Sequence, residues 1–263
     1  MRSIKLIFRL MSIMLIVWKK FCHDNCFMRA GSLAYVTLLS LVPLFTLSFS
    51  ILSAFPMFKG LDQKVENLIF NNFVADSAQT IQGYIHIFME QTGRLSVIGL
   101  VFLLITAVLI VFTMEQTFNA IWNVRRNRQG ATAFLIYWAV ITLIPIFTAT
   151  ALWITDCFTV LPWLTHLSVV APYVAIFIAV TFLYIALPNC KVAVRPALIA
   201  ALIGTILFEL ARKAFAIYII NFATYTVIYG ALASVPIFLL WVYVSWVVIL
   251  FGAVASNVLN QQL

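Results

Sequence analysis

Residues 197–252 read ALIAALIGTILFELARKAFAIYIINFATYTVIYGALASVPIFLLWVYVSWVVILFG, and this stretch decides the fold. It contains two apolar runs, each long enough for the roughly 20 helical residues that cross a bilayer. Glu209, Arg212 and Lys213 lie inside the first run. A charge in the hydrocarbon core costs at least about 2.5 kcal/mol, so such residues are usually paired, extended toward the interface, or functional. The stretch therefore predicts two membrane spans and a charged triplet (Glu209, Arg212 and Lys213) that needs an explanation.

The composition of the whole chain extends this prediction beyond the stretch. Of 263 residues, 64% are hydrophobic and only 9% are charged, whereas soluble domains carry about a quarter charged residues. The mean hydropathy is +1.09. We therefore expect an all-α, polytopic membrane protein that forms a single helical membrane domain over residues 1–263.

The apolar runs predict six transmembrane helices. Their expected ranges are 31–55, 95–113, 132–154, 169–187, 197–220 and 231–254. Three prolines fall inside them, and an interior proline removes a backbone hydrogen bond and kinks a helix. We expect such kinks at Pro43, Pro145 and Pro236.

Two further segments are expected to be helical without crossing the membrane. Residues 1–29 carry six basic side chains, and their apolar run from Leu10 to Trp18 is too short to span. They predict a cationic amphipathic helix on the cytoplasmic leaflet, with a signal anchor as the alternative. Residues 56–94, the first outer loop, show helical periodicity in two places and predict two short amphipathic helices.

The basic residues predict the orientation. With six spans, the N-terminus, residues 114–131, residues 188–196 and the C-terminus share one side, which holds eleven of the sixteen Lys and Arg residues. Because basic residues are retained inside, both termini are expected in the cytoplasm. The net charge of +8 is then a consequence of topology and of contact with anionic lipid. It does not indicate a nucleic-acid partner.

The sequence offers no recognisable catalytic or metal centre. It lacks G-x-S-x-G, the P-loop and H-E-x-x-H, and its acidic and histidine residues are widely spaced. Cys22-His23-x-x-Cys26 has too few ligands for a structural zinc site, which normally has four. We therefore expect no enzyme activity, cofactor or metal.

Intramembrane polar residues are the remaining candidates for a site. Glu209, Arg212 and Lys213 share one helical face, with Glu209 and Lys213 in the favourable i, i+4 order. Glu115 and Asn119 also lie four residues apart. The triplet is either an ion pair near the outer interface or the polar lining of a substrate path, where Arg212 or Lys213 attracts an anionic headgroup or solute.

Small residues at a spacing of four mark faces where helices can pack closely. Such pairs are Ala30 and Ala34, Ala197 and Ala201, Ala200 and Gly204, and Gly252 and Ser256. They could serve packing within the bundle or a homo-oligomer.

Several short motifs together resemble the YihY/BrkB family of bacterial inner-membrane proteins. They are Ser32-Leu33-Ala34-Tyr35, Pro43-Leu44, Asn119-x-Ile121-Trp122, Pro188-Asn189, Arg195-Pro196-Ala197, Glu209 with Lys213-x-Phe215, Tyr225-x-x-x-Tyr229-Gly230, Leu240-Trp241-x-Tyr243 and Gly252-Ala253. The resemblance implies six spans and cytoplasmic termini. The family has been labelled both a virulence factor and ribonuclease BN; the absence of a catalytic cluster argues against the second label.

Three hypotheses for the function follow. The first is a transporter or lipid-handling protein of the cell envelope, whose partners are membrane lipids including anionic phospholipid. The alternative is a non-transporting scaffold or assembly partner. A membrane-associated ribonuclease is the third, and the sequence supports it least.

Overall fold

The computed structural model describes residues 2–53, 97–124, 165–221 and 234–262, together with Ala139 and Thr142. Within these ranges every regular element is an α-helix, which confirms the expected all-α class for the described part of the chain. The helices are α1 (Arg2–His23), α2 (Cys26–Ser53), α5 (Val97–Ile121), α7 (Thr165–Ala186), α8 (Val194–Asn221) and α10 (Ser234–Gln262).

Two of these helices contain segments long and apolar enough to cross a membrane, namely Val194–Ile219 in α8 and Pro236–Gln262 in α10. Shorter apolar helical segments are Val108–Ile121 and Tyr173–Ala186. The expected span at 132–154 and the two loop helices in 56–94 lie outside the described residues, apart from the helical Ala139 and Thr142.

The helices extend further than the apolar runs that predicted them. α5 continues to Ile121 instead of ending near 113, and α10 continues to Gln262 instead of 254. Both extensions are polar in sequence, yet Glu115, Asn119 and Asn257 are buried. Hydropathy locates only the apolar part of a helix, whereas the helix itself continues as long as its backbone hydrogen bonds do. The polar side chains of these extensions have partners inside the bundle.

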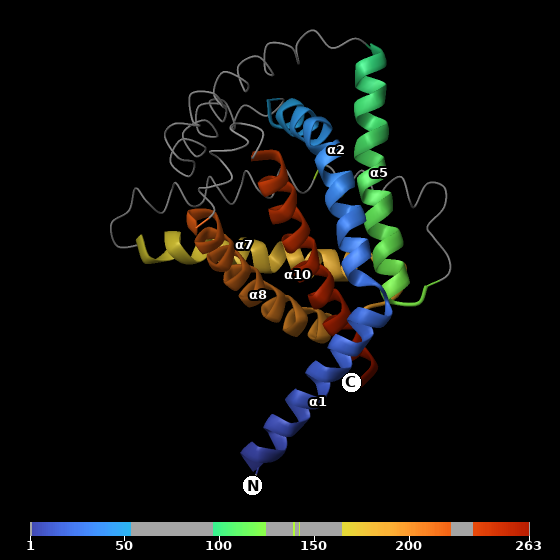
Figure 1. Cartoon of the computed structure of the whole chain (residues 1–263). Helices are drawn as coiled ribbons and strands as arrows, with labels where there is room; N and C mark the ends of the chain where they lie inside the picture. Colours follow the sequence, from blue (N-terminus) through green and yellow to red (C-terminus); the bar gives the residue numbers. More distant parts are fainter. Residues whose placement is uncertain are drawn as a thin grey trace.

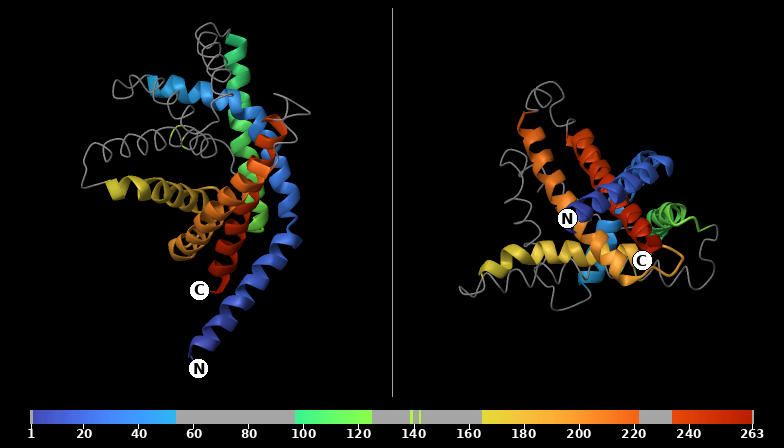
Figure 2. Two further views of the ribbon diagram at one scale, coloured as in Figure 1. Left: turned by 60° about the vertical axis from the view of Figure 1, so that its left-hand side comes forward. Right: turned by 90° about the horizontal axis from the view of Figure 1, so that it is seen from below.

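α10 lies at the centre of the described bundle. It contacts each of the other five helices, and α2–α5, α7–α8 and α1–α2 also pack together. Figure 1 shows α8 and α2 on either side of α10. Figure 2 shows α7 crossing α8 and α10 at a large angle, with α1 projecting beyond the bundle.

Several helix ends gather at one end of the bundle, which we call the loop end (residues 22–29, 119–124, 187–195 and 257–262). The Asn189 amide donates to Asn119 Oδ1 at 2.8 Å, and the Ala193 amide donates to Asn260 Oδ1 at 3.1 Å. These bonds join the end of α5 and the end of α10 to the α7–α8 connection (Figure 1). The segments that were predicted to share one side of the membrane thus lie together at the loop end, as far as the structure describes them.

Three helices pack tightly around Tyr184 of α7. Its side chain is fully buried, and its hydroxyl donates to the Ile249 carbonyl of α10 at 3.0 Å. Gly204 of α8 and Gly252 of α10 lie against this hydroxyl: a Cβ at Gly204 would lie 3.1 Å from it, and one at Gly252 would collide with it. Two of the predicted small-residue faces thus allow three helices to meet around one tyrosine.

The polar residues of α2 connect it to its neighbours. Thr37 Oγ1 donates to the Leu33 carbonyl at 2.7 Å and accepts from Trp246 Nε1 of α10 at 3.0 Å. Ser40 Oγ donates to the Thr106 carbonyl of α5 at 3.2 Å. Ala30 and Ala34, predicted to form a close-contact face, are both buried.

The three proline predictions have different outcomes. α2 continues through Pro43, and Figure 2 shows that this helix is bent; a kink at Pro43 itself stays a prediction. Pro145 lies outside the described residues. Pro236 is the third residue of α10 as described, in the first turn, where a proline costs no intrahelical hydrogen bond.

Candidate functional site

The charged triplet of α8 contains a two-pronged ion pair. Arg212 Nε donates to Glu209 Oε2 at 2.9 Å, and its Nη2 donates to Oε1 at 2.7 Å. The i, i+3 spacing and the flat guanidinium make this bidentate geometry available. The favourable i, i+4 order pointed to Lys213 as the partner of Glu209. The structure instead pairs Glu209 with Arg212 and leaves Lys213 exposed.

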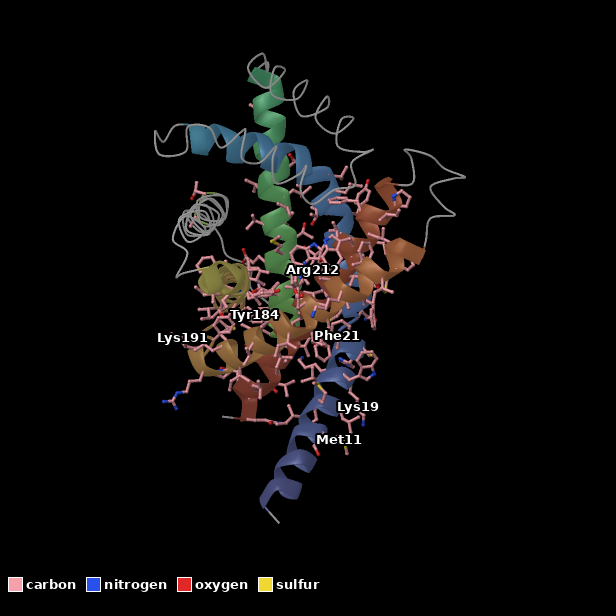
Figure 3. The ribbon with its side chains drawn as sticks, turned by 90° about the vertical axis from the view of Figure 1, so that its left-hand side faces the viewer. Met11, Lys19, Phe21, Tyr184, Lys191 and Arg212 are labelled. Carbon is pink, nitrogen blue, oxygen red and sulfur yellow. The ribbon has the colours of Figure 1, made fainter. Side chains whose placement is uncertain are left out.

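The triplet lies on a face of α8 that is exposed at the surface of the described bundle. The Arg212 side chain is 56% exposed and that of Glu209 is 22% exposed. Large apolar residues on the same helix are also exposed: Leu202, Ile206, Leu210 and Ile217. Tyr173 of α7 interacts with the Arg212 guanidinium, so the pair lies beside the α7–α8 contact. Figure 3 shows Arg212 on the other side of Tyr184 from Lys191 of the loop end.

Glu115 and Asn119 form a separate, buried polar pair. Asn119 Nδ2 donates to Glu115 Oε1 at 3.3 Å, and Asn119 Oδ1 accepts the Asn189 amide. Both side chains are essentially inaccessible. Glu209 lies fifteen residues beyond Val194, about 22 Å along α8 from the loop end. The two sets of predicted polar residues therefore occupy different places, and Asn119 holds the α7–α8 connection against α5.

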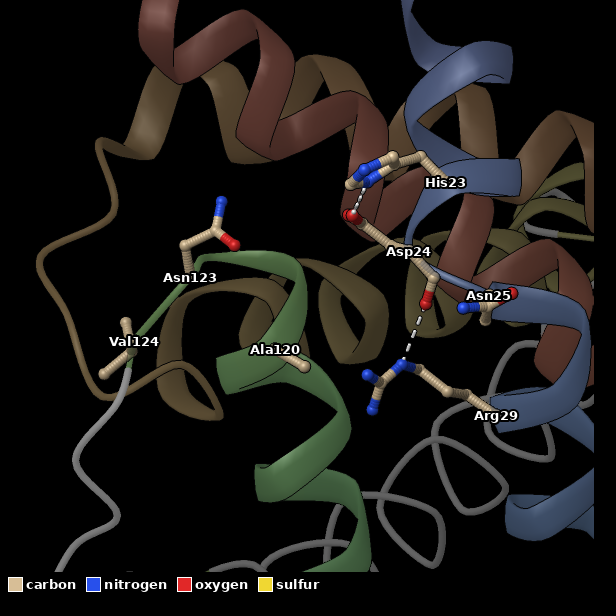
Figure 4. Close-up of a pocket in the computed structure, with 7 residues that line it drawn as sticks. All are labelled: His23, Asp24, Asn25, Arg29, Ala120, Asn123 and Val124. Atoms are coloured by element: carbon tan, nitrogen blue, oxygen red, sulfur yellow. Dashed lines mark hydrogen bonds and ion pairs between the residues drawn. The ribbon is translucent and has the colours of Figure 1, made fainter.

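The loop end also contains a pocket of about 550 Å³ that the sequence did not predict. Figure 4 shows it between the α1–α2 turn and the end of α5. Its lining residues are His23, Asp24, Asn25, Arg29, Ala120, Asn123 and Val124. Its two sides are about a hundred positions apart in the sequence, and no local motif connects them.

Backbone geometry shapes both sides of this pocket. Asn25 and Asn123 have φ values of 52° and 55°, in the left-handed region that asparagine tolerates better than most residues. Asn123 ends α5 in a Schellman arrangement, in which its amide bonds Ala120 O and the Val124 amide bonds Asn119 O. The only sequence signal for these turns was an asparagine two residues after the end of each helix.

Charges in the pocket are partly paired. Asp24 Oδ2 lies 2.9 Å from Lys20 Nζ, and its Oδ1 lies 3.2 Å from His23 Nδ1. Arg29 Nε donates to the Asp24 carbonyl oxygen at 3.0 Å. In Figure 4 the two amino groups of the Arg29 guanidinium reach toward the α5 side of the pocket.

The two cysteines near the pocket differ in exposure. Cys22 is exposed, whereas Cys26 is buried. Burial and, secondarily, the charge of Asp24 raise the pKa of the Cys26 thiol to about 12, so this thiol stays protonated. Among the described residues, no group of three or more His, Cys, Asp and Glu side chains could hold a metal ion.

Comparison with known proteins identifies the family. The sequence model of the family described as Virulence factor BrkB matches residues 17–263. This chain belongs to the BrkB family. The motif resemblance is thereby confirmed over nearly the whole chain.

The relatives of this BrkB-family chain are named as membrane proteins. A UPF0761 membrane protein of Legionella pneumophila strain Philadelphia 1 is 41% identical over 249 residues, covering 91% of this chain and 60% of the relative. A UPF0761 membrane protein of Alteromonas mediterranea is 40% identical over 244 residues, covering 89% of this chain and 83% of the relative. The chain thus spans about 60% of the length of the Legionella relative. No solved structure matches this chain.

Proposed function

We propose that this BrkB-family chain is a multi-pass protein of the bacterial inner membrane that transports or otherwise handles an anionic lipid or solute. In this proposal the loop end lies in the cytoplasm, because its excess of basic residues favours retention on that side of the membrane. The observation that carries the proposal is the exposure of Arg212, 56% of its side chain, on a helix long and apolar enough to cross the membrane.

The chemistry of the triplet supports an anionic ligand. Glu209 holds the Arg212 guanidinium in a fixed orientation through two hydrogen bonds. Lys213 adds a positive charge beside this pair, so the triplet carries a net charge of about +1 in its ionised form. An excess positive charge in apolar surroundings is costly alone and favourable beside a phosphate or carboxylate. In this proposal the triplet binds the phosphate or carboxylate transiently while the ligand moves along α8.

Reconstitution tests this proposal. Liposomes that contain the chain and fluorescently labelled phosphatidylglycerol should show labelled lipid crossing between leaflets faster than in empty vesicles. Lys213→Gln and Glu209→Gln should each slow this flux, because one removes the excess charge and the other releases Arg212. Lys191→Gln is the matched control, since Lys191 is an exposed lysine of the loop end. Flux equal to that of empty vesicles, or unchanged in both variants, would contradict the proposal.

A non-transporting scaffold is the second candidate. It is favoured by the dense junction of α7, α8 and α10 around Tyr184, which suits a rigid assembly. It expects no flux from a correctly folded chain. We further propose that the chain has no ribonuclease activity, so purified protein with Mg²⁺ should leave labelled RNA intact; cleavage abolished by a variant of the chain would reverse this view.

A further inference from the structure

We infer that the pocket at the loop end binds a phosphate group, either in the headgroup of an anionic phospholipid or as free phosphate. This site is separate from the charged triplet and does not depend on the transport proposal. Its residues come from the α1–α2 turn, the first turn of α2 and the end of α5.

Arg29 supplies the central contact. Its side chain is partly buried, and the bond from Nε to the Asp24 carbonyl fixes the plane of the guanidinium. The two amino groups are then directed into the pocket (Figure 4). Across the described residues, no ion pair joins Arg29 to a carboxylate. A fixed guanidinium with two amino groups available is the arrangement that recognises phosphate oxygens.

The one carboxylate at the pocket is already neutralised. Asp24 is held by Lys20 at 2.9 Å, and its side chain is only 10% exposed. An incoming anion would therefore meet the Arg29 guanidinium in preference to the Asp24 carboxylate. Two carbonyls at the end of α5 are likewise engaged, because the Asn123 amide donates to Ala120 O and the Val124 amide donates to Asn119 O.

Asparagine amides complete the lining on both sides. Asn25 lies directly before α2, where the positive end of the helix dipole favours an anion, and Asn123 lies opposite at the end of α5. Each amide group can donate to a phosphate oxygen. The volume of about 550 Å³ accommodates a phosphate with part of a headgroup.

The position of the pocket is compatible with a lipid source. α1 presents an exposed apolar stripe of Met11, Met14, Leu15 and Trp18 on the approach to the α1–α2 turn. Such a stripe at the loop end is suited to the lipid interface. A phospholipid seated beside α1 could then place its phosphate against Arg29.

Native mass spectrometry of the purified full chain tests the inference. The probes are phosphatidylglycerol, phosphatidylcholine as the lipid without net charge, and inorganic phosphate. Arg29→Gln should weaken the binding of phosphatidylglycerol or of inorganic phosphate, whichever the wild type binds, about tenfold. This is the size expected for losing one charge-assisted contact. Lys19→Gln, which removes an exposed charge of α1 outside the pocket lining, should change it less than about twofold.

A second variant keeps the charge and the fold. The pair Asn25→Gly and Asn123→Gly removes both amides at positions where glycine adopts the observed backbone without strain. It should weaken binding several-fold with an unchanged thermal unfolding midpoint. Selective loss of phosphatidylglycerol assigns the site to a headgroup, and selective loss of inorganic phosphate assigns it to the free ion. The inference is overturned if Arg29→Gln and the double glycine variant bind phosphatidylglycerol and inorganic phosphate as the wild type does, or if Lys19→Gln loses as much binding as Arg29→Gln.

Discussion

At the scale of single residues, the contact between Tyr184 and Gly252 makes the sharpest prediction about stability. Gly252→Ala places a Cβ against the Tyr184 hydroxyl and 2.9 Å from Cζ, so a helix must shift. We expect a loss of about 1–3 kcal/mol from overpacking, measured as a lower midpoint of thermal unfolding in detergent. Gly204→Ala should cost less, because its Cβ would lie 3.1 Å from the hydroxyl.

A glycine elsewhere in the bundle provides the control. Gly31→Ala would place a Cβ 3.9 Å from Tyr243 Cε2, an ordinary contact, so it should stabilise α2 by up to about 1 kcal/mol. Equal behaviour of Gly31→Ala and Gly252→Ala would show that the Tyr184 junction is not as tight as described.

The Cys26 thiol makes a prediction about pH. Its pKa is raised from the ordinary 9.0 to about 12, mainly by burial, in a position that precedes the predicted span. Between pH 9 and 12 the unfolded thiol ionises and the folded one does not, so this residue should lower stability as pH rises through that window. In native protein at pH 8, maleimide should modify the exposed Cys22 rapidly and Cys26 only after denaturation. Rapid labelling of a chain that retains Cys26 as its sole cysteine would contradict the burial.

At the scale of helices, the bond between α2 and α10 through Thr37 can be isolated. Thr37→Val preserves shape but leaves the Trp246 indole N–H without its acceptor, at a cost of about 1–3 kcal/mol. Thr113→Val is the matched control, because Thr113 is more exposed and donates to the Leu109 carbonyl of its own helix. Similar unfolding midpoints for the two variants would mean that the interhelical bond contributes little.

The helices also show what sequence patterns could predict. Small residues at a spacing of four correctly indicated close packing at Ala30 and Ala34, because that property depends only on position along one helix. The ends of α5 and α10 were not predictable from hydropathy, because Asn119 and Asn257 are buried by tertiary contacts. Glu209 pairs with Arg212 and not with Lys213, because the guanidinium forms two hydrogen bonds with the carboxylate. Residue spacing alone does not predict this preference.

At the scale of the whole molecule, the loop-end pocket depends on tertiary packing and was not predictable from the sequence. Arg29 contributed to the prediction only as one basic residue among eleven. Its contact with the Asp24 carbonyl and its position opposite Asn123 depend on how α2 and α5 pack. The grouping of segments at one end was predictable because alternation of spans determines it, whereas the pocket formed by that grouping was not.

The same grouping predicts the topology of the chain in the cell. Cys22 and Cys190 are exposed at the loop end, from the α1–α2 turn and from the α7–α8 connection. If the basic residues keep this end inside, a membrane-impermeant maleimide added to intact spheroplasts should label neither cysteine. After the membrane is opened with detergent, variants that retain only Cys22 or only Cys190 should both be labelled. Labelling of one cysteine but not the other in intact cells would contradict the shared side, and labelling of both would place the loop end outside.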